Sequence, residues 1–285
     1  TTGNANVAVG KDALKANTTA DNNTAVGIDA LTANTTGHSN VAIGANALLT
    51  STTRLGNTAV GFNAAKVTDT TGIVAVGYKA MEANTTGYDA VAVGASSLLA
   101  NTTGHSNTAV GFSALAANTT GADNTAVGNS ALLANTTGTR NTVVGVDSSN
   151  QITSGSDNTA MGFDSLTRCT TGVSNSCFGK DAGDNITNGG YNTCLGIDSG
   201  TNITQGSAHV MVGDSTTASA ENSQNEIVIG VGIAGVGSNS FTFGKASNRV
   251  SNDFDTNASW TRSSDINKKT NIENTDLGLS FINEL

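Results

Sequence analysis

Carboxylate side chains recur in this sequence at a regular spacing. Asp29, Asp147, Asp164, Asp181 and Asp198 each lie two residues after a glycine, and the last four follow one another at 17-residue intervals. A column of this kind could collect cations, and two carboxylates paired across neighbouring chains could hydrolyse a glycosidic bond. Repeated acids on an elongated protein also keep it soluble, and we expect that role here rather than catalysis.

Histidine and cysteine give no sign of metal chemistry. His38 and His105 fall in the same turn phase of a repeat, and neither has a His or Cys partner at metal-ligand spacing. We therefore expect no metal site and no cofactor. Cys169, Cys177 and Cys194 are too few for a disulfide framework. The latter two take a position that is usually Ala, so we expect buried free thiols; a stacked or inter-chain disulfide is the alternative.

A short phrase closed by glycine, typified by "NTAVG", sets these spacings. Before the glycine come a Thr or Val, a small residue and an apolar residue. This alternation predicts a short strand, and the glycine permits the turn that follows. Nearly every step between the anchor glycines is 17 residues, with one of 16 and a last one of 14. They are Gly10, Gly27, Gly44, Gly61, Gly77, Gly94, Gly111, Gly128, Gly145, Gly162, Gly179, Gly196, Gly213, Gly230 and Gly244.

The other half of each repeat reads like residues 30–37, "ALTANTTG". Ala-Leu is a second apolar contact, on a short strand or a single helical turn, and Asn-Thr-Thr-Gly is turn chemistry. Seventeen residues cannot hold a strand, a crossover helix and two loops. The sequence therefore predicts an all-β fold, a β-solenoid of about fifteen mostly 17-residue coils. Coils about 4.8 Å apart would give a rod on the order of 65–70 Å long.

An asparagine recurs three residues before the apolar residue of the phrase. Stacked Asn side chains can form a hydrogen-bonded ladder from coil to coil, although an Asn could equally start the turn before the strand. The absence of Pro fits a ladder, because Pro would delete a hydrogen bond. His209 replaces this Asn in one coil. The expected ladder residues include Asn23, Asn40, Asn57, Asn107, Asn124 and Asn141.

Composition restricts the partners. The formal charge of −9 and the pI near 4.6 argue against nucleic acid. The longest apolar candidate for a membrane span, residues 226–237, is short, Gly-rich and in phase with the repeat, so we expect no membrane insertion. Aromatic residues make up only 4%, which predicts a thin core. We therefore expect a homotrimer in which copies bury the small Ala positions against one another around a common axis.

The repeat stops after Gly244. We divide the chain into a solenoid at 1–244, a non-repeat junction at 245–263 and the start of a further domain at 264–285. The last segment is loosely amphipathic, and its apolar pattern has barely begun at Leu285.

The segment "SSDINKKTNI" (263–272) resembles the opening of the intramolecular chaperone domain of phage tail fibres, tailspikes and endosialidases. Ser264, Asp265, Lys269 and Ile272 match its pattern, whereas residues 267–268 depart from it. The resemblance implies a trimerising domain that cuts itself off between Ser264 and Asp265. It gives Ser264 as the nucleophile and Lys269 as a candidate base, a pairing that is chemically reasonable because a neutral Lys can activate a hydroxyl.

The coils are similar to the head repeats of trimeric autotransporter adhesins. The phrase "NVAIG" (40–44) is close to the repeat of that family, and the final 14-residue step matches its period. This resemblance implies a left-handed parallel β-roll with three chains side by side.

Together these features predict the trimeric rod of a virion tail fibre, which presents or forms a surface for a host-cell glycan or protein. The expected location is the virion, outside the cell. A bacterial surface trimeric adhesin head is the alternative. We expect no enzyme beyond a single self-cleavage per chain; a glycan depolymerase would need a cleft with paired acids or aromatic platforms.

Overall fold

The computed structural model describes residues 2–255 and 261–262, which form strands and turns without a helix. The first thirteen strands have three residues each. The strands are β1 (Val7–Val9), β2 (Thr24–Val26), β3 (Val41–Ile43), β4 (Thr58–Val60), β5 (Val74–Val76), β6 (Val91–Val93), β7 (Thr108–Val110), β8 (Thr125–Val127), β9 (Thr142–Val144), β10 (Thr159–Met161), β11 (Ser176–Phe178), β12 (Thr193–Leu195), β13 (Val210–Val212), β14 (Ile227–Val231), β15 (Ser240–Lys245), β16 (Asn248–Asp253) and β17 (Thr261–Arg262).

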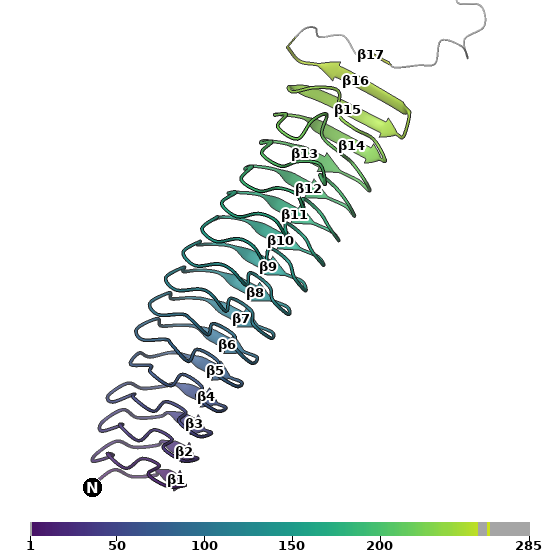
Figure 1. The fold of residues 1–285 in the computed structure, drawn as a ribbon. Helices are drawn as coiled ribbons and strands as arrows, with labels where there is room; N and C mark the ends of the chain where they lie inside the picture. Colours follow the sequence, from purple (N-terminus) through teal and green to yellow (C-terminus); the bar gives the residue numbers. More distant parts are fainter. Residues whose placement is uncertain (1, 256–260, 263–285) are drawn as a thin grey trace, which may run out of the picture.

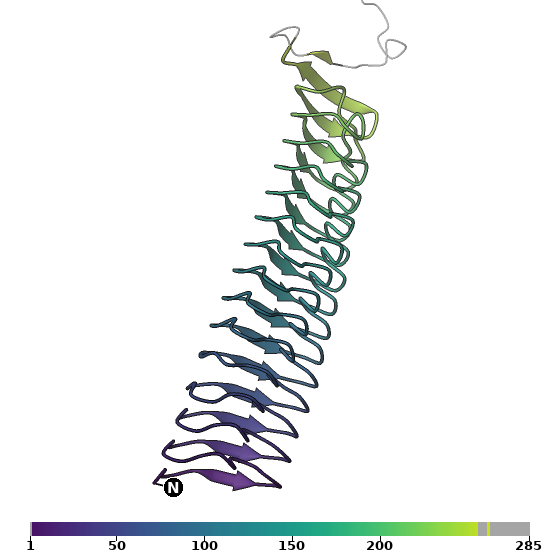
Figure 2. The same cartoon turned by 60° about the vertical axis from the view of Figure 1, so that its left-hand side comes forward.

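Strands β1 to β15 pair in parallel, each with the next along the chain, as in β1–β2 and β14–β15. Equivalent residues of consecutive repeats are partners, so Ala8 pairs with Ala25 and Ala25 with Ala42. The result is a β-solenoid of about fourteen turns, drawn as a long rod in Figure 1 and from a second side in Figure 2. The predicted solenoid with coils of about 17 residues is confirmed.

The parallel stack ends in an antiparallel hairpin. Strand β16 pairs antiparallel with β15, from Ser240–Asp253 to Lys245–Asn248, and β17 pairs antiparallel with β16. This reversal falls where the sequence phrase stops.

The Ala-Leu segment is neither a strand nor a helical turn. Within it the backbone alternates into the left-handed region two and four residues after the anchor glycine, as at Asp29 (φ 58°) and Leu31 (φ 52°). Amides of this segment bond carbonyls of neighbouring turns; Leu31 N donates to Ala47 O at 3.0 Å. Leu fits this position because its side chain is not branched at Cβ, whereas a β-branched residue is a genuine outlier at positive φ.

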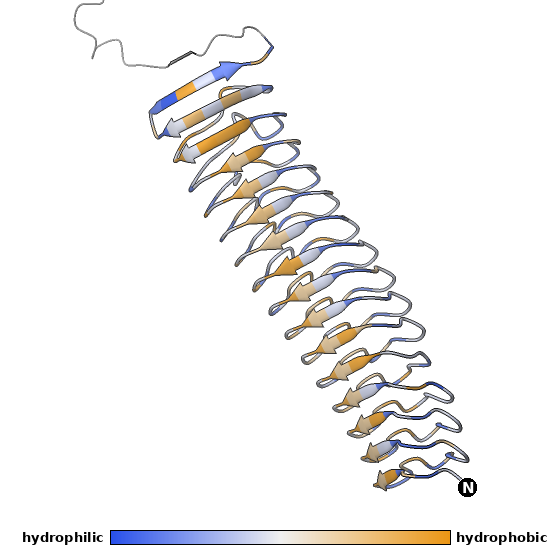
Figure 3. Cartoon of the chain, turned by 180° about the vertical axis from the view of Figure 1, so that it is seen from behind, coloured by the Kyte–Doolittle hydropathy of each residue, from blue (hydrophilic) through white to orange (hydrophobic). Residues whose placement is uncertain are grey.

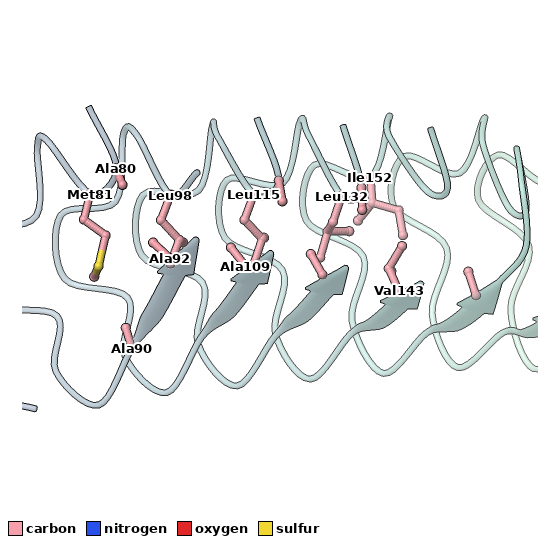
Figure 4. Packing of buried hydrophobic residues seen from close by; sticks show 14 of the residues in the cluster. Ala80, Met81, Ala90, Ala92, Leu98, Ala109, Leu115, Leu132, Val143 and Ile152 are labelled. Atoms are coloured by element: carbon pink, nitrogen blue, oxygen red, sulfur yellow. The ribbon is translucent and has the colours of Figure 1, made fainter. Parts of the chain in front are cut away.

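The core is a narrow column of small and medium side chains that runs through the coils along the rod. From β2 to β13 the central strand residue, most often Ala, is buried together with the Leu of the turn segment, for example Ala109 and Leu115 (Figure 4). The expectation that Ala positions pack between copies is therefore wrong, because strand residues alternate and the central one points into the chain's own core.

Within each turn, a smaller side chain at one core position goes with a larger side chain at another. Where the turn segment has Leu, the residue three further on is usually Asn; where it has Gly183 or Gly200, that residue is Ile186 or Ile203. A Cβ on Gly183 would lie 3.0 Å from Ile186 Cδ1, so the isoleucine fills the space that Leu takes elsewhere. The turns thus keep one core volume with two different residue pairs.

The anchor glycines are required by the close approach of neighbouring turns. Gly111 has φ +137°, and a Cβ there would lie 2.3 Å from the carbonyl oxygen of Gly128. Any larger residue would force adjacent turns apart.

Candidate functional site

The outward face of the parallel sheet carries a continuous apolar column. The first and third residues of strands β1–β14 are half-buried or exposed, and the residue between them is buried in every strand except β1. We call these residues the sheet-face stripe. Figure 3 shows this face, with apolar residues in orange along the length of the rod. The third residue is apolar in every one of these strands, and the first is Val, Ile, Thr or Ser.

Bulky side chains flank the stripe just after several anchor glycines. Phe112 is 57% exposed, and Phe163 and Ile197 are about half exposed. Phe62 and Tyr78 stack on each other from neighbouring turns, with ring centroids 5.6 Å apart. These side chains extend the apolar part of this face, although the same position holds Lys11, Lys180 and Asp214 in other turns.

The six asparagines singled out by the sequence lie fully buried at the start of each strand. Asn40 Nδ2 donates to Asn23 Oδ1 at 3.1 Å, and Asn141 Nδ2 donates to Asn124 Oδ1 at the same distance. Each also holds a turn: Asn124 Nδ2 donates to Gly138 O at 2.9 Å. The ladder role and the turn role therefore belong to the same side chain.

The ladder is interrupted once and then runs on. Ile73 and Ala90 take the position in two turns; Asn57 keeps its turn bond to Thr70 O, and its Oδ1 accepts from Ile73 N at 3.2 Å. From Asn107 the bonds continue through Asn158 and Asn175 to Asn192.

Sequence reasoning missed a second ladder. The Asn of the Asn-Thr-Thr-Gly turn is also buried, and Nδ2 of Asn101, Asn118 and Asn135 each donates to Oδ1 of the preceding Asn in the series at 2.8 Å. In the next turn the position is Ile152, and Asn135 Oδ1 is left without a partner. The 17-residue recurrence of this Asn was the signal for it.

His209 and Glu226 end the first ladder with ionisable residues that are fully buried. His209 Nε2 donates to Ser223 O at 2.8 Å, and its Nδ1 accepts from Glu226 N at 3.3 Å, which defines a neutral imidazole. Burial lowers the pKa of His209, and the Glu226 charge opposes that effect. The Glu226 carboxylate accepts from the backbone N and hydroxyl of Ser219.

The three cysteines are free and buried. Cys177 and Cys194 are partners in the register of β11 and β12. A hydrogen bond with Cys194, together with burial, raises the pKa of Cys177 well above its usual value. Burial raises the pKa of Cys169 to about 12. Cys169 and Cys177 are poor nucleophiles, because the thiolate is the reactive form.

The carboxylate column lies in the turn segment beside the strands. Partial burial, with Asp181 and Asp147 as like-charged neighbours, raises the pKa of Asp164. Asp181 forms an ion pair with Lys180 at 2.7 Å. In the part of the chain that the structure describes, no three His, Cys, Asp or Glu residues are grouped as a metal site would require.

Ser264, Asp265 and Lys269 lie outside the described residues, so their predicted roles stay predictions. Over residues 2–255 and 261–262, no helix is long and apolar enough to cross a membrane.

Comparison with protein-family models, with curated proteins and with solved structures finds no match for this chain.

Proposed function

We propose that this chain is the shaft and host-attachment component of a virion tail fibre, assembled from three copies. The observation that carries the proposal is the uninterrupted stack of turns from β1 to β15, which makes a rod of one repeated cross-section. A rod of this kind spaces two ends and repeats one surface along its length. Both are mechanical tasks of a fibre.

The turns supply a repetitive surface for weak, multivalent contacts. Exposed hydroxyls recur in the Asn-Thr-Thr-Gly turns at Thr36, Thr103, Thr120 and Thr137. Neighbouring turns lie about 4.8 Å apart, so a glycan chain lying along the rod would meet several equivalent groups. Individually weak contacts of this sort become useful through avidity, which three copies on one fibre would multiply.

Binding rather than catalysis is the role we assign to the described residues. The acids of the turn column share one phase of the repeat, and the three thiols are buried with raised pKa values where a shift is resolved. Chemistry is limited in this proposal to one self-cleavage between Ser264 and Asp265, which rests on the resemblance of residues 263–272 alone.

A bacterial surface adhesin head is the second candidate. The parallel coils and the 14-residue step from β14 to β15 favour it, since both resemble the head repeats of that class. Self-processing separates the two candidates, because only the fibre reading includes a cut after Ser264.

The test is the denaturing intact mass of the product of the complete gene, compared with its Ser264→Ala variant. We expect the wild-type product to separate into two pieces at Ser264–Asp265 and the variant to stay whole. An uncut wild-type chain would contradict the self-processing fibre and favour the adhesin head.

A further inference from the structure

The sheet-face stripe is as large as the largest apolar patches of ordinary monomers. It extends over thirteen intervals between β1 and β14, which at about 4.8 Å each is about 60 Å. The strand residues alone make it about 10 Å wide, so its area is on the order of 600 Å². With the positions just after the anchor glycines, which include Lys11, Lys180 and Asp214, the whole face is about 15 Å wide and on the order of 900 Å². The largest apolar patch on a typical monomer is about 300–600 Å² and is often functional.

The stripe also excludes charge. No first or third residue of β1–β14 is Asp, Glu, Lys, Arg or His, although the chain as a whole carries 12% charged residues. None of the five ion pairs of the described residues uses a stripe residue, and only Lys180–Asp181 borders the stripe, because Lys180 follows an anchor glycine. A large exposed apolar patch rimmed by polar residues marks an interaction site, so a stripe without charge indicates a covered face.

The repeat of the stripe restricts what can cover it. An apolar residue stands at every turn, at the spacing set by the backbone hydrogen bonds between turns. A partner that fills the face from β1 to β14 needs apolar groups at the same spacing over the same length. A second copy of this chain has both by construction.

We propose that the sheet-face stripe is the surface through which copies of this chain dock on one another, parallel and in register. The inference rests on the trimer of the proposed function and adds its interface. A threefold axis along the rod carries each copy onto the next without reversing it, so equivalent turns meet around a closed ring. The area of the whole face per copy, stripe and flanking positions together, is close to the roughly 800 Å² per partner of a standard specific interface.

Charge placed in the centre of the stripe should separate the copies. The variant Val93→Lys, Val110→Lys, Val127→Lys puts three ammonium groups on this face, at positions that are 36–37% exposed in the single chain. The matched control Thr86→Lys, Thr103→Lys, Thr120→Lys adds the same charge at exposed turn residues. Sedimentation equilibrium gives the mass, and far-UV circular dichroism checks that the coils persist.

We expect a trimer for the wild type and the control, and a folded monomer for the stripe variant. A stripe variant that stays trimeric would overturn the interface and leave the trimer standing on another surface. A monomeric wild type at tens of micromolar would overturn the trimer itself. Loss of the trimer in both the stripe variant and the turn control would also refute the interface. The added net charge, and not its position on the stripe, would then decide assembly.

Cross-linking tests whether the docked copies run parallel or antiparallel. Ile43→Cys and Ile229→Cys place thiols near opposite ends of the stripe, and the native cysteines are buried from a bismaleimide reagent. In a parallel assembly each variant cross-links with itself. Cross-linking only in a mixture of the two variants would show an antiparallel arrangement and contradict the proposal.

Discussion

At the scale of single residues, the fold is held by buried amides as much as by apolar contacts. A turn with three or four small apolar side chains buries little area, whereas each ladder Asn satisfies buried backbone groups that would otherwise have no partner. Asn124 is an example: its Oδ1 accepts from Asn141 N at 3.0 Å, and its Nδ2 reaches Gly138 O in a turn. Buried amides of this kind fix the register between turns.

Replacing Asn124 by Ala should therefore be costly. The substitution leaves the backbone N–H of Asn141 buried without its acceptor. A buried donor left unpaired costs about 1–3 kcal/mol. We expect a lower unfolding midpoint in urea and faster amide hydrogen exchange around residue 141. Thr120→Ala, at an exposed turn position, is the control and should change stability by less than about 0.5 kcal/mol. Unchanged exchange at Asn141 would contradict the ladder's role.

His209 should make the C-terminal turns sensitive to acid. Its pKa is lowered in the folded chain, so below the unfolded value of about 6.5 the unfolded state binds more protons than the folded state. Stability is then full above about pH 6.5 and falls as the pH drops below it. His209→Asn, which restores the ladder residue, should flatten the thermal stability between pH 7.5 and pH 5.5. If the melting temperatures of the wild type and of His209→Asn fell equally between pH 7.5 and pH 5.5, His209 would not be the cause of the acid sensitivity.

The first ladder could be foreseen from the sequence because Asn stands at one phase of the period. The replacement at His209 could be read from the same phase, but the partner of the Glu226 carboxylate could not, because Ser219 lies outside that phase. The roles of Ser264 and Lys269 depend on a resemblance and stay predictions.

At the scale of elements, each turn of the solenoid is a strand followed by a segment with two left-handed residues. The strands could be predicted, because alternation and glycine mark them. The segment between them could not be assigned from propensity, because Leu at φ near 50° is disfavoured locally. It is held there by its bonds to the next turn, such as Leu115 N to Ala131 O at 3.1 Å.

Because two positions of each turn share one core volume, substitutions at Leu132 and Asn135 should be energetically coupled. Leu132→Ser alone opens a cavity, and deletion of a buried Leu side chain to Ala costs about 2–5 kcal/mol. The next turn already uses Ser149 with Ile152. Adding Asn135→Ile to Leu132→Ser should therefore recover much of the loss. A double-mutant cycle by urea denaturation measures this, and additive effects of the two changes would contradict this coupling.

Two glycines should respond in opposite ways to substitution. At Gly111 a Cβ would meet Gly128 O at 2.3 Å, so Gly111→Ala should separate neighbouring turns and strongly reduce protection from hydrogen exchange on both sides. At Gly56 (φ +69°) a Cβ meets nothing within 4 Å, and Ser39 and Ser106 hold the equivalent position at positive φ. We expect Gly56→Ser to cost about 1 kcal/mol. Equal effects at the two sites would refute close backbone approach as the reason for the anchor glycine.

At the scale of the whole molecule, each turn contacts only its neighbours, so rod length follows from the number of repeats. The period alone was sufficient to predict this shape. The surface by which copies would meet was misjudged, because the Ala positions fill the chain's own core and the Val positions face outward. Deciding which of two alternating positions is inside requires knowing that the turn segment lies on the Ala side.

The measurement that tests the account most directly is a cryo-electron microscopy reconstruction of the purified protein. We expect three parallel rods, each on the order of 65–70 Å long, around a threefold axis, with the faces of strands β1–β14 toward that axis. Single rods, or an assembly in which these faces point to solvent, would contradict it.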